Sequence, residues 1–254
     1  MHDELTFALH AVEDASRVAS SWAADLRTRS KADGSPVTDL DLELDGQLVV
    51  AIQRGWPEDG ILSEEGGAVH GRSGRTWIVD PIDGTASFVA GGSAWGTHLA
   101  LAENGAVLLG VISRPSLGRM IWAARSRGSW SGAPGRRSVR KLQVSRNESE
   151  ANVRAVGLLE PGEPSAVELE AAAGVLLQDD FVVEALADGR ADVFLDDAGK
   201  AWDQAPAVVI VEEAGGRFTS LHGRHAYDDG YGVYSNGALH GWAVAVARRA
   251  GAAC

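Results

Sequence analysis

A nine-residue stretch in the first third of the chain constrains the fold most. It occupies positions 77–85 and reads Trp-Ile-Val-Asp-Pro-Ile-Asp-Gly-Thr. Aromatic and β-branched residues before Asp80 predict the end of a buried strand. Pro81 has no backbone N–H and a fixed φ, so we expect the chain to turn there. The stretch therefore predicts two carboxylates, Asp80 and Asp83, at the carboxyl end of a strand, where open α/β sheets bind ligands.

This stretch has an ordinary and a chemical interpretation. Turn residues are often acidic and solvated, so two aspartates separated by two residues carry little information by themselves. Hard divalent cations, however, prefer oxygen ligands, and the turn offers two carboxylates with the carbonyl of Ile82 between them. The full string is more specific than the acid pair, because it joins a strand, a proline turn and a glycine.

Composition limits the classes of partner. The 254 residues include 35 acidic and 23 basic ones, and the net charge is −12. Such a surface repels nucleic acid and anionic membranes, so we expect neither as a partner. The only cysteine is Cys254, which excludes an internal disulfide and a zinc–thiolate site. The N-terminal residues do not resemble a signal peptide and no apolar run is long enough to span a membrane, so we expect a cytoplasmic protein.

Hydrophobic periodicity divides the chain into two halves, residues 1–146 and 147–254. The first half is predicted to contain two helices, at 4–27 and 38–55, followed by an antiparallel meander with a hairpin turn at Asn104-Gly105. The second half alternates strand and helix, which predicts layers of helices around sheets. Its expected strands are 153–158, 191–195 and 231–234, and its expected helices are 165–177 (capped by Ser165), 181–186, 201–214 and 239–249.

Four segments or residues in the pattern are predicted to be structural or solvated. Lys31 lies in a polar loop and is expected to be solvated. Residues 68–75 are expected to form a glycine-rich loop across the mouth of the site, and residues 132–141 a basic surface loop. His98 alternates with its neighbours on a strand, which favours a structural role over a catalytic one.

The stretch at 77–85 resembles the metal-binding signature of the inositol monophosphatase superfamily. Four other matches follow in the family's order: 36–41 for VTxxD, 63–66 for GEE with Ser63 in place of glycine, 201–205 for WDxA, and 211–216 for EAGG. Residues 31–38 and 210–219 are most similar to the histidinol-phosphate phosphatase branch. The resemblance implies an α+β fold built as an α-β-α-β-α layered sandwich, and a homodimer.

The matching positions include five carboxylates, Asp41, Glu64, Asp80, Asp83 and Asp203. Five acids can share a pocket only if cations neutralise them. Because no His or Cys is among them, the ligand set favours Mg²⁺, with Mn²⁺ as a substitute. The resemblance implies two or three ions: Glu64, Asp80 and the Ile82 carbonyl would hold one, Asp80, Asp83 and Asp203 a second, and Glu64 would contact a weaker third through water.

The resemblance also implies a mechanism, the direct attack of metal-activated water on a phosphate monoester. Thr85, paired with Asp41, would orient or deprotonate the water, and Glu64 would take part by holding the activating ion. The backbone N–H groups of Gly84 and Thr85 would bind phosphate oxygens.

The sequence predicts the class of reaction more specifically than it predicts the substrate. An acid seven residues before Asp203 binds the substrate body in the family, and this position is Asp196 here. Asp179 and Asp180 stand where relatives have other residues. Together the three acids could pair with a cationic substrate such as histidinol phosphate, or bind hydroxyls of inositol or sugar phosphates or of nucleoside monophosphates. A catalytically silent metal-binding regulatory protein is the non-enzyme alternative.

Overall fold

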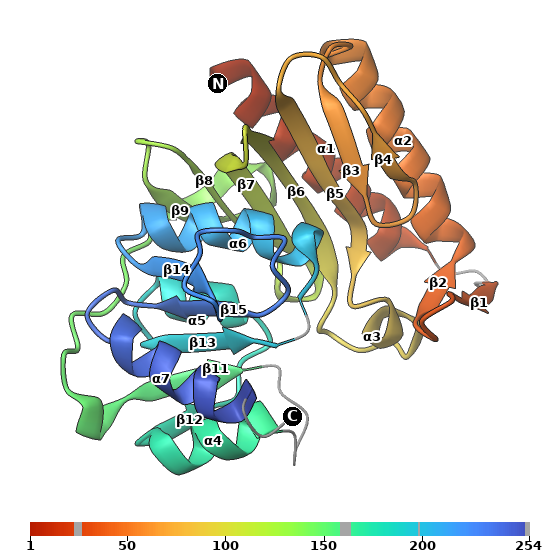
Figure 1. The fold of residues 1–254 in the computed structure, drawn as a ribbon. Coiled ribbons are helices and arrows are strands. Elements are labelled where there is room, and N and C mark those ends of the chain that lie inside the picture. The colour runs from red at the N-terminus through yellow and green to blue at the C-terminus, as the bar shows by residue number, and fades with distance from the viewer. Residues whose placement is uncertain (23–26, 158–163, 198, 252–254) are drawn as a thin grey trace.

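The computed structural model describes residues 1–22, 27–157, 164–197 and 199–251. Two twisted sheets and their helices form stacked layers (Figure 1). The first sheet has the order β10-β9-β8-β7-β6-β5-β3-β4. Its strands are β3 (Gly60–Ser63), β4 (Gly67–Val69), β5 (Arg75–Asp83), β6 (Gly96–Glu103), β7 (Ala106–Arg114), β8 (Arg119–Ala124), β9 (Ser129–Ala133) and β10 (Arg137–Lys141).

The second sheet has the order β12-β11-β13-β15-β14 and mixes parallel with antiparallel pairs. Its strands are β11 (Arg154–Gly157), β12 (Val175–Leu177), β13 (Val193–Asp196), β14 (Arg217–Ser220) and β15 (Gly232–Ser235). A separate ribbon pairs β1 (Thr28–Ser30) with β2 (Pro36–Thr38). Short 3-10 turns lie at Pro115–Leu117, Pro134–Arg136 and Glu150–Asn152.

Helices cover both outer faces and fill the space between the sheets (Figure 1). On one face of the first sheet, α1 (His2–Ser21) and α2 (Asp39–Gly55) pack against Trp77 and Val79 of β5. Ile78, which points the opposite way because strand side chains alternate, packs with α5 (Val182–Ala187) and α6 (Ala201–Glu213). The outer face of the second sheet is covered by α4 (Pro164–Ala172) and α7 (His240–Gly251). The predicted α-β-α-β-α sandwich is confirmed.

The helix α6 lies between the two sheets, and its residues 205–211 are all apolar. Its residues 204–211 are all buried, and they contact both sheets. A helix that is hydrophobic all round needs this kind of burial. Since Asp203 stands in the first turn of α6, the layer that α6 forms also decides where this acid lies.

Several predicted elements differ from the structure. The predicted helix at 165–177 begins at Pro164, one residue before its expected cap, and ends at Ala172, after which β12 joins the sheet. A short apolar run such as 175–177 fits either element, and pairing with β11 decides it. Residues 217–220, to which the sequence pattern assigned no element, make β14 by pairing with β15.

Three expected loops also contain strands. The basic segment includes β10, which pairs with β9 at the sheet edge, and the glycine-rich segment includes part of β4, which pairs with β3. The polar segment before Pro36 includes β1. In each case the residues are exposed, so backbone pairing and not an apolar pattern produces the strand.

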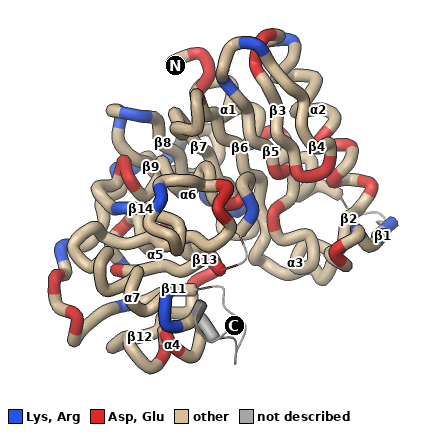
Figure 2. The backbone as a smooth tube through the Cα atoms, in the orientation of Figure 1, with Lys and Arg blue, Asp and Glu red and all other residues tan. Residues whose placement is uncertain are grey.

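Acidic and basic residues are distributed along the whole backbone that is drawn in colour, and acidic residues lie at the carboxyl end of β13 (Figure 2). No helix in the described part of the chain combines the length and the apolar character that crossing a bilayer requires.

Candidate active site

Asp80 and Asp83 are placed by a bulge in β5. Asp80 pairs with His98 of β6 and Asp83 with Gly96, so three steps on β5 match two on β6. The strand therefore does not stop at Asp80, as predicted from Pro81, but continues through one extra residue. Bulges redirect side chains beside active sites. Here the bulge leaves Asp80 buried while Asp83 keeps a partly accessible side chain.

Glu64 approaches Asp80, and Asp41 approaches Thr85, from neighbouring elements. Glu64 follows β3, which runs parallel to β5, and its N–H donates to the Val79 carbonyl at 3.0 Å. Asp41 lies in the first turn of α2, where its Oδ2 accepts from the Thr38 N–H at 2.9 Å in a capping box. The remaining oxygen, Oδ1, lies 3.0 Å from Thr85 Oγ1.

Thr85 is held by two acceptors. Its Oγ1 lies 3.0 Å from Asp41 Oδ1 and 3.0 Å from the Ile82 carbonyl. A hydroxyl has one proton to donate, so it bonds to only one of these oxygens at a time and keeps lone pairs to accept another hydrogen bond. Gly84 makes the tight turn before it: its φ is +75°, and a Cβ there would lie 2.3 Å from the Ala94 carbonyl oxygen.

Asp203 joins the group from α6. Its Oδ2 accepts from the Lys200 N–H at 2.8 Å, which fixes the carboxylate at the helix start. Asp80, Asp83, His98 and Asp203 each offer one ligand atom, and these atoms lie within 4.8 Å of one another. The structure thus brings residues from β5, β6 and α6 together, although Asp203 is more than a hundred positions from the others.

The electrostatics of this group are unbalanced. Burial raises the pKa of Asp80 well above its ordinary value, and the nearby charges of Glu64, Asp83 and Asp203 raise it further. Burial and the Asp83 charge raise the pKa of Asp203 to about 8. Among the described residues, Asp80 Oδ1 is buried without a hydrogen-bond partner.

A cation fits this arrangement. Crowded acids with raised pKa values are stabilised by a positive charge, and an unpartnered buried carboxylate oxygen is a ready ligand. The donor set is dominated by carboxylate oxygens, which suits hard divalent ions. The residues present therefore fit a divalent metal centre.

The comparisons with known proteins agree with this geometry. The model of the inositol monophosphatase family matches residues 2–252. The chain belongs to this family. A histidinol-phosphatase of Mycobacterium tuberculosis is 37% identical over 248 residues, which cover 94% of this chain and 95% of the relative. A fructose-1,6-bisphosphatase/inositol-1-monophosphatase of Thermotoga maritima is 31% identical, with 83% and 81% covered.

The solved structures include an IMPase of Thermotoga maritima with a TM-score of 0.83 and 27% identity, covering 98% of each chain. Membership in the inositol monophosphatase family makes this protein a phosphatase that hydrolyses phosphate monoesters. The acidic group on β5 and α6 is accordingly its candidate active site.

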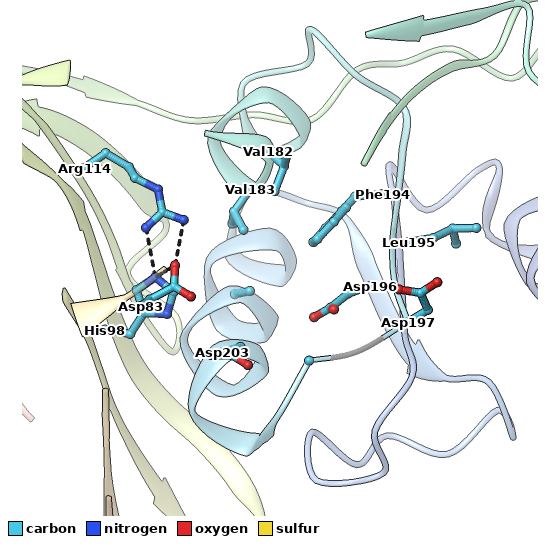
Figure 3. A pocket seen from close by; sticks show the side chains of 12 residues that line it. Asp83, His98, Arg114, Val182, Val183, Phe194, Leu195, Asp196, Asp197 and Asp203 are labelled. Carbon is cyan, nitrogen blue, oxygen red and sulfur yellow. Dashed lines mark hydrogen bonds and ion pairs between the residues drawn. The ribbon is translucent and has the colours of Figure 1, made fainter. Parts of the chain in front are cut away.

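The substrate-selecting acids predicted for this family member are divided between two cavities. Asp196 and its neighbour Asp197 line a cavity of about 230 Å³ together with Asp83 and Asp203 (Figure 3). Asp179 and Asp180 line a different cavity. Asp179 forms an ion pair with Arg190, and Asp180 accepts from Ser93 Oγ at 2.9 Å. Only Asp196 therefore lies beside the acids of the candidate active site.

Lys31 is not solvated as predicted. Its Nζ lies 2.6 Å from Glu64 and 2.7 Å from Glu65, with one-fifth of the side chain exposed. Partial burial acts to lower its pKa, but the hydrogen bonds to both glutamates raise it above the ordinary value. The ribbon of β1 and β2 carries Lys31 to the acids, and this contact has no signal in the sequence.

Two residues of the site, His98 and Arg114, were missed as functional candidates. Both are buried, and both contact Asp83: Arg114 Nη2 lies 3.0 Å and His98 Nε2 3.4 Å from its Oδ2 (Figure 3). The alternation that made His98 look structural also places it opposite Asp80 on the paired strand. Only the register of β5, β6 and β7 shows that these residues meet.

Proposed function

We propose that this chain hydrolyses a small-molecule phosphate monoester with Mg²⁺ as its cation, and that histidinol phosphate is the first substrate to test. The observation that carries the proposal is the group of Asp80, Asp83 and Asp203, with ligand atoms within 4.8 Å and an unpartnered oxygen on Asp80. Oxygen donors outnumber the single imidazole, which favours Mg²⁺ and allows Mn²⁺.

The residues that would hold the cations are Glu64, Asp80, the Ile82 carbonyl, Asp83 and Asp203. Bound divalent ions supply Lewis-acid charge to the phosphoryl group, which carboxylates cannot do. The carboxylates also need these ions, because Asp80 and Asp203 repel each other and Glu64 in a poorly solvated place.

The proton-handling group would be Thr85 with Asp41. When Thr85 donates to Asp41 Oδ1, its own oxygen is left to accept a hydrogen from a water molecule. That arrangement would turn the water's lone pair toward a phosphorus atom in front of it, which is the positioning that hydrolysis needs. The N–H groups of Gly84 and Thr85 remain candidates for the phosphate oxygens.

The leaving group would occupy the cavity beside Asp196. One wall of this cavity carries Asp196 and Asp197, and another is apolar, with Val182 and Phe194 (Figure 3). An ammonium or imidazolium could pair with the acids while the carbon skeleton covers the apolar wall. This chemistry, and the 37% identity to a histidinol-phosphatase, support histidinol phosphate. The bifunctional relative supports inositol and sugar phosphates as the second candidates.

A screen of phosphorylated metabolites tests the proposal. Phosphate release is measured with Mg²⁺ and again with excess EDTA, using histidinol phosphate, inositol and sugar phosphates, and nucleoside monophosphates. We expect release from one class to dominate and to vanish with EDTA. Release that is undiminished in EDTA would contradict the metal, and no release from any ester would favour a catalytically silent metal-binding protein.

Asp196→Ala tests the selecting acid. We expect KM for the best substrate to rise by the equivalent of about 1.5–3 kcal/mol, the cost of one charged hydrogen bond. Hydrolysis of p-nitrophenyl phosphate should change little, because this ester offers no group for Asp196 to bind. Asp180→Ala removes one acid outside the cavity and is the matched control. Equal losses on both esters would assign Asp196 to the metal site or to the fold.

A further inference from the structure

Arg114 is an unusual residue for a site that binds metal ions. It is 6% exposed at the end of β7, within the group of acids. Its Nη2 forms an ion pair with Asp83 Oδ2 at 3.0 Å, and its guanidinium carbon lies 5.4 Å from the centre of the Phe181 ring. A buried guanidinium is always protonated, so it places a permanent positive charge beside one of the carboxylates.

His98 contacts both members of this ion pair. Its Nε2 lies 3.4 Å from Arg114 Nη1 and 3.4 Å from Asp83 Oδ2 (Figure 3). His98 and Arg114 are both buried, so the imidazole packs beside the guanidinium and helps to hold it at Asp83.

The charge of Arg114 distinguishes Asp83 from the other two aspartates. The guanidinium lies 3.0 Å from Asp83, whereas in the described part of the chain no ion pair joins Asp80 or Asp203 to a cationic side chain. Asp83 is therefore the one of the three aspartates that a neighbouring charge neutralises.

We propose that Arg114 is a built-in cation of the active site, held by His98, that neutralises Asp83 and thereby weakens the binding of a second divalent ion at Asp83 and Asp203. The inference rests on the proposed metal-dependent function and adds a residue that sets how the ions are bound. A second ion there would share Asp83 with a guanidinium 3.0 Å away, and like charges repel strongly at such separations in a buried site. The first ion, at Glu64 and Asp80, meets a different cation, because Lys31 Nζ lies 2.6 Å from Glu64. Each metal position therefore has its own neighbouring cation, and Arg114 is the one at Asp83.

Titration with Mn²⁺, followed by the electron paramagnetic resonance signal of free ion, tests the proposal on the whole chain. The Arg114→Met variant keeps most of the volume and removes the charge, and Arg114→Lys keeps the charge. Arg72→Met removes an exposed arginine that pairs with Glu58. We expect Arg114→Met to tighten the weaker Mn²⁺ site by about tenfold or more. Arg114→Lys and Arg72→Met should resemble the wild type.

The outcomes separate the two proposals. An unchanged or weaker second site in folded Arg114→Met, with two sites still present, would overturn the role of Arg114 and leave the metal-dependent function intact. A wild-type protein that binds no Mn²⁺ would overturn both.

A measurement on the wild type decides the question if Arg114→Met does not fold. The ¹⁵N–¹H signal of the Arg114 side chain, assigned with Arg114→Lys, is followed during a titration with diamagnetic Mg²⁺. We expect it to stay in place while the tighter site fills and to shift as the weaker site fills. A signal whose position does not change as the second ion binds would overturn the proposal.

Discussion

Three aspartates with the same chemistry behave differently in this site because of their neighbours. Asp80 and Asp203 are buried beside other acids, and burial together with those charges raises the pKa of each. Asp83 contacts a guanidinium, and its pKa is lowered. The residue type alone therefore does not show which carboxylate lacks a cationic partner and which is already paired with one.

Thr85 provides a test at the level of one hydroxyl. We expect Thr85→Ala to lower kcat by about a hundredfold or more, as loss of a proton-handling group does, with little change in the affinity for Mn²⁺. Thr85→Ser keeps the hydroxyl near Asp41 and is the control, expected to retain most of the rate. Steady-state kinetics and a Mn²⁺ titration on each variant make the comparison. Loss of metal affinity in Thr85→Ala would move this residue from the water to the metal centre.

At the scale of elements, the site depends on how closely α6 approaches β7. A Cβ on Gly110 of β7 would lie 2.6 Å from Pro206 Cα and 2.8 Å from its carbonyl oxygen. Glycine thus allows the helix backbone to rest on the strand, and that contact holds α6, with Asp203 at its start, against the first sheet. Backbone atoms cannot move aside as a flexible side chain can.

Substitution of two glycines tests this packing. We expect Gly110→Ala to lower the free energy of unfolding by about 1–3 kcal/mol, the usual cost of overpacking. Gly46→Ala, in the exposed face of α2 with nothing within 4 Å of the added carbon, should raise it by about 0.5–1 kcal/mol. Urea denaturation measures both. Equal stability of Gly110→Ala and the wild type would show that α6 can shift without cost.

At the scale of the whole molecule, the acids from the two sheets meet across the buried layer of α6. The metal-free fold must therefore hold like charges together, and divalent ions that bind only the folded state stabilise it by mass action. Metal binding and the packing of the layers are coupled in this way.

The pH dependence of stability follows from Asp203. The pKa of Asp203 is raised from an ordinary 3.8 to about 8 in the folded protein. Folding therefore favours the protonated carboxyl. The contribution of this protonation to the free energy of unfolding is fully present below about pH 3.8 and is lost as the pH rises to about 8. In EDTA, raising the pH from 5 to 8 should lower the thermal unfolding midpoint of the wild type more than that of Asp203→Asn. Mg²⁺ should reduce the difference between the midpoints of these two proteins at pH 8. Asp14→Asn, which removes an exposed acid, is the control; parallel curves for all three proteins would refute the assignment.

The oligomeric state is a prediction at the same scale. Resemblance to the family is its only basis, and we expect a homodimer in solution. Light scattering at micromolar concentration measures the mass directly. A mass near 26.6 kDa, that of one chain, would contradict the prediction.

The sequence by itself determined the features that are local in the chain. Residues 77–85 carry two acids, a proline and a glycine in one turn, and the continuous apolar run before Asp80 predicted a buried strand, because both properties depend on neighbouring residues. The layered fold followed from the order of such patterns. The bulge after Asp80 did not, since a bulge is defined by the partner strand.

Tertiary structure alone decided which distant residues meet. The contacts of Lys31 with Glu64, and of Arg114 with Asp83, depend on ribbon packing and on strand register, and neither leaves a periodic signal. Separation of Asp179 from Asp196 is likewise decided by the course of the chain between β12 and β13. Acids can be recognised from their motif, but the charges that neutralise them come from residues whose positions only the packed layers specify.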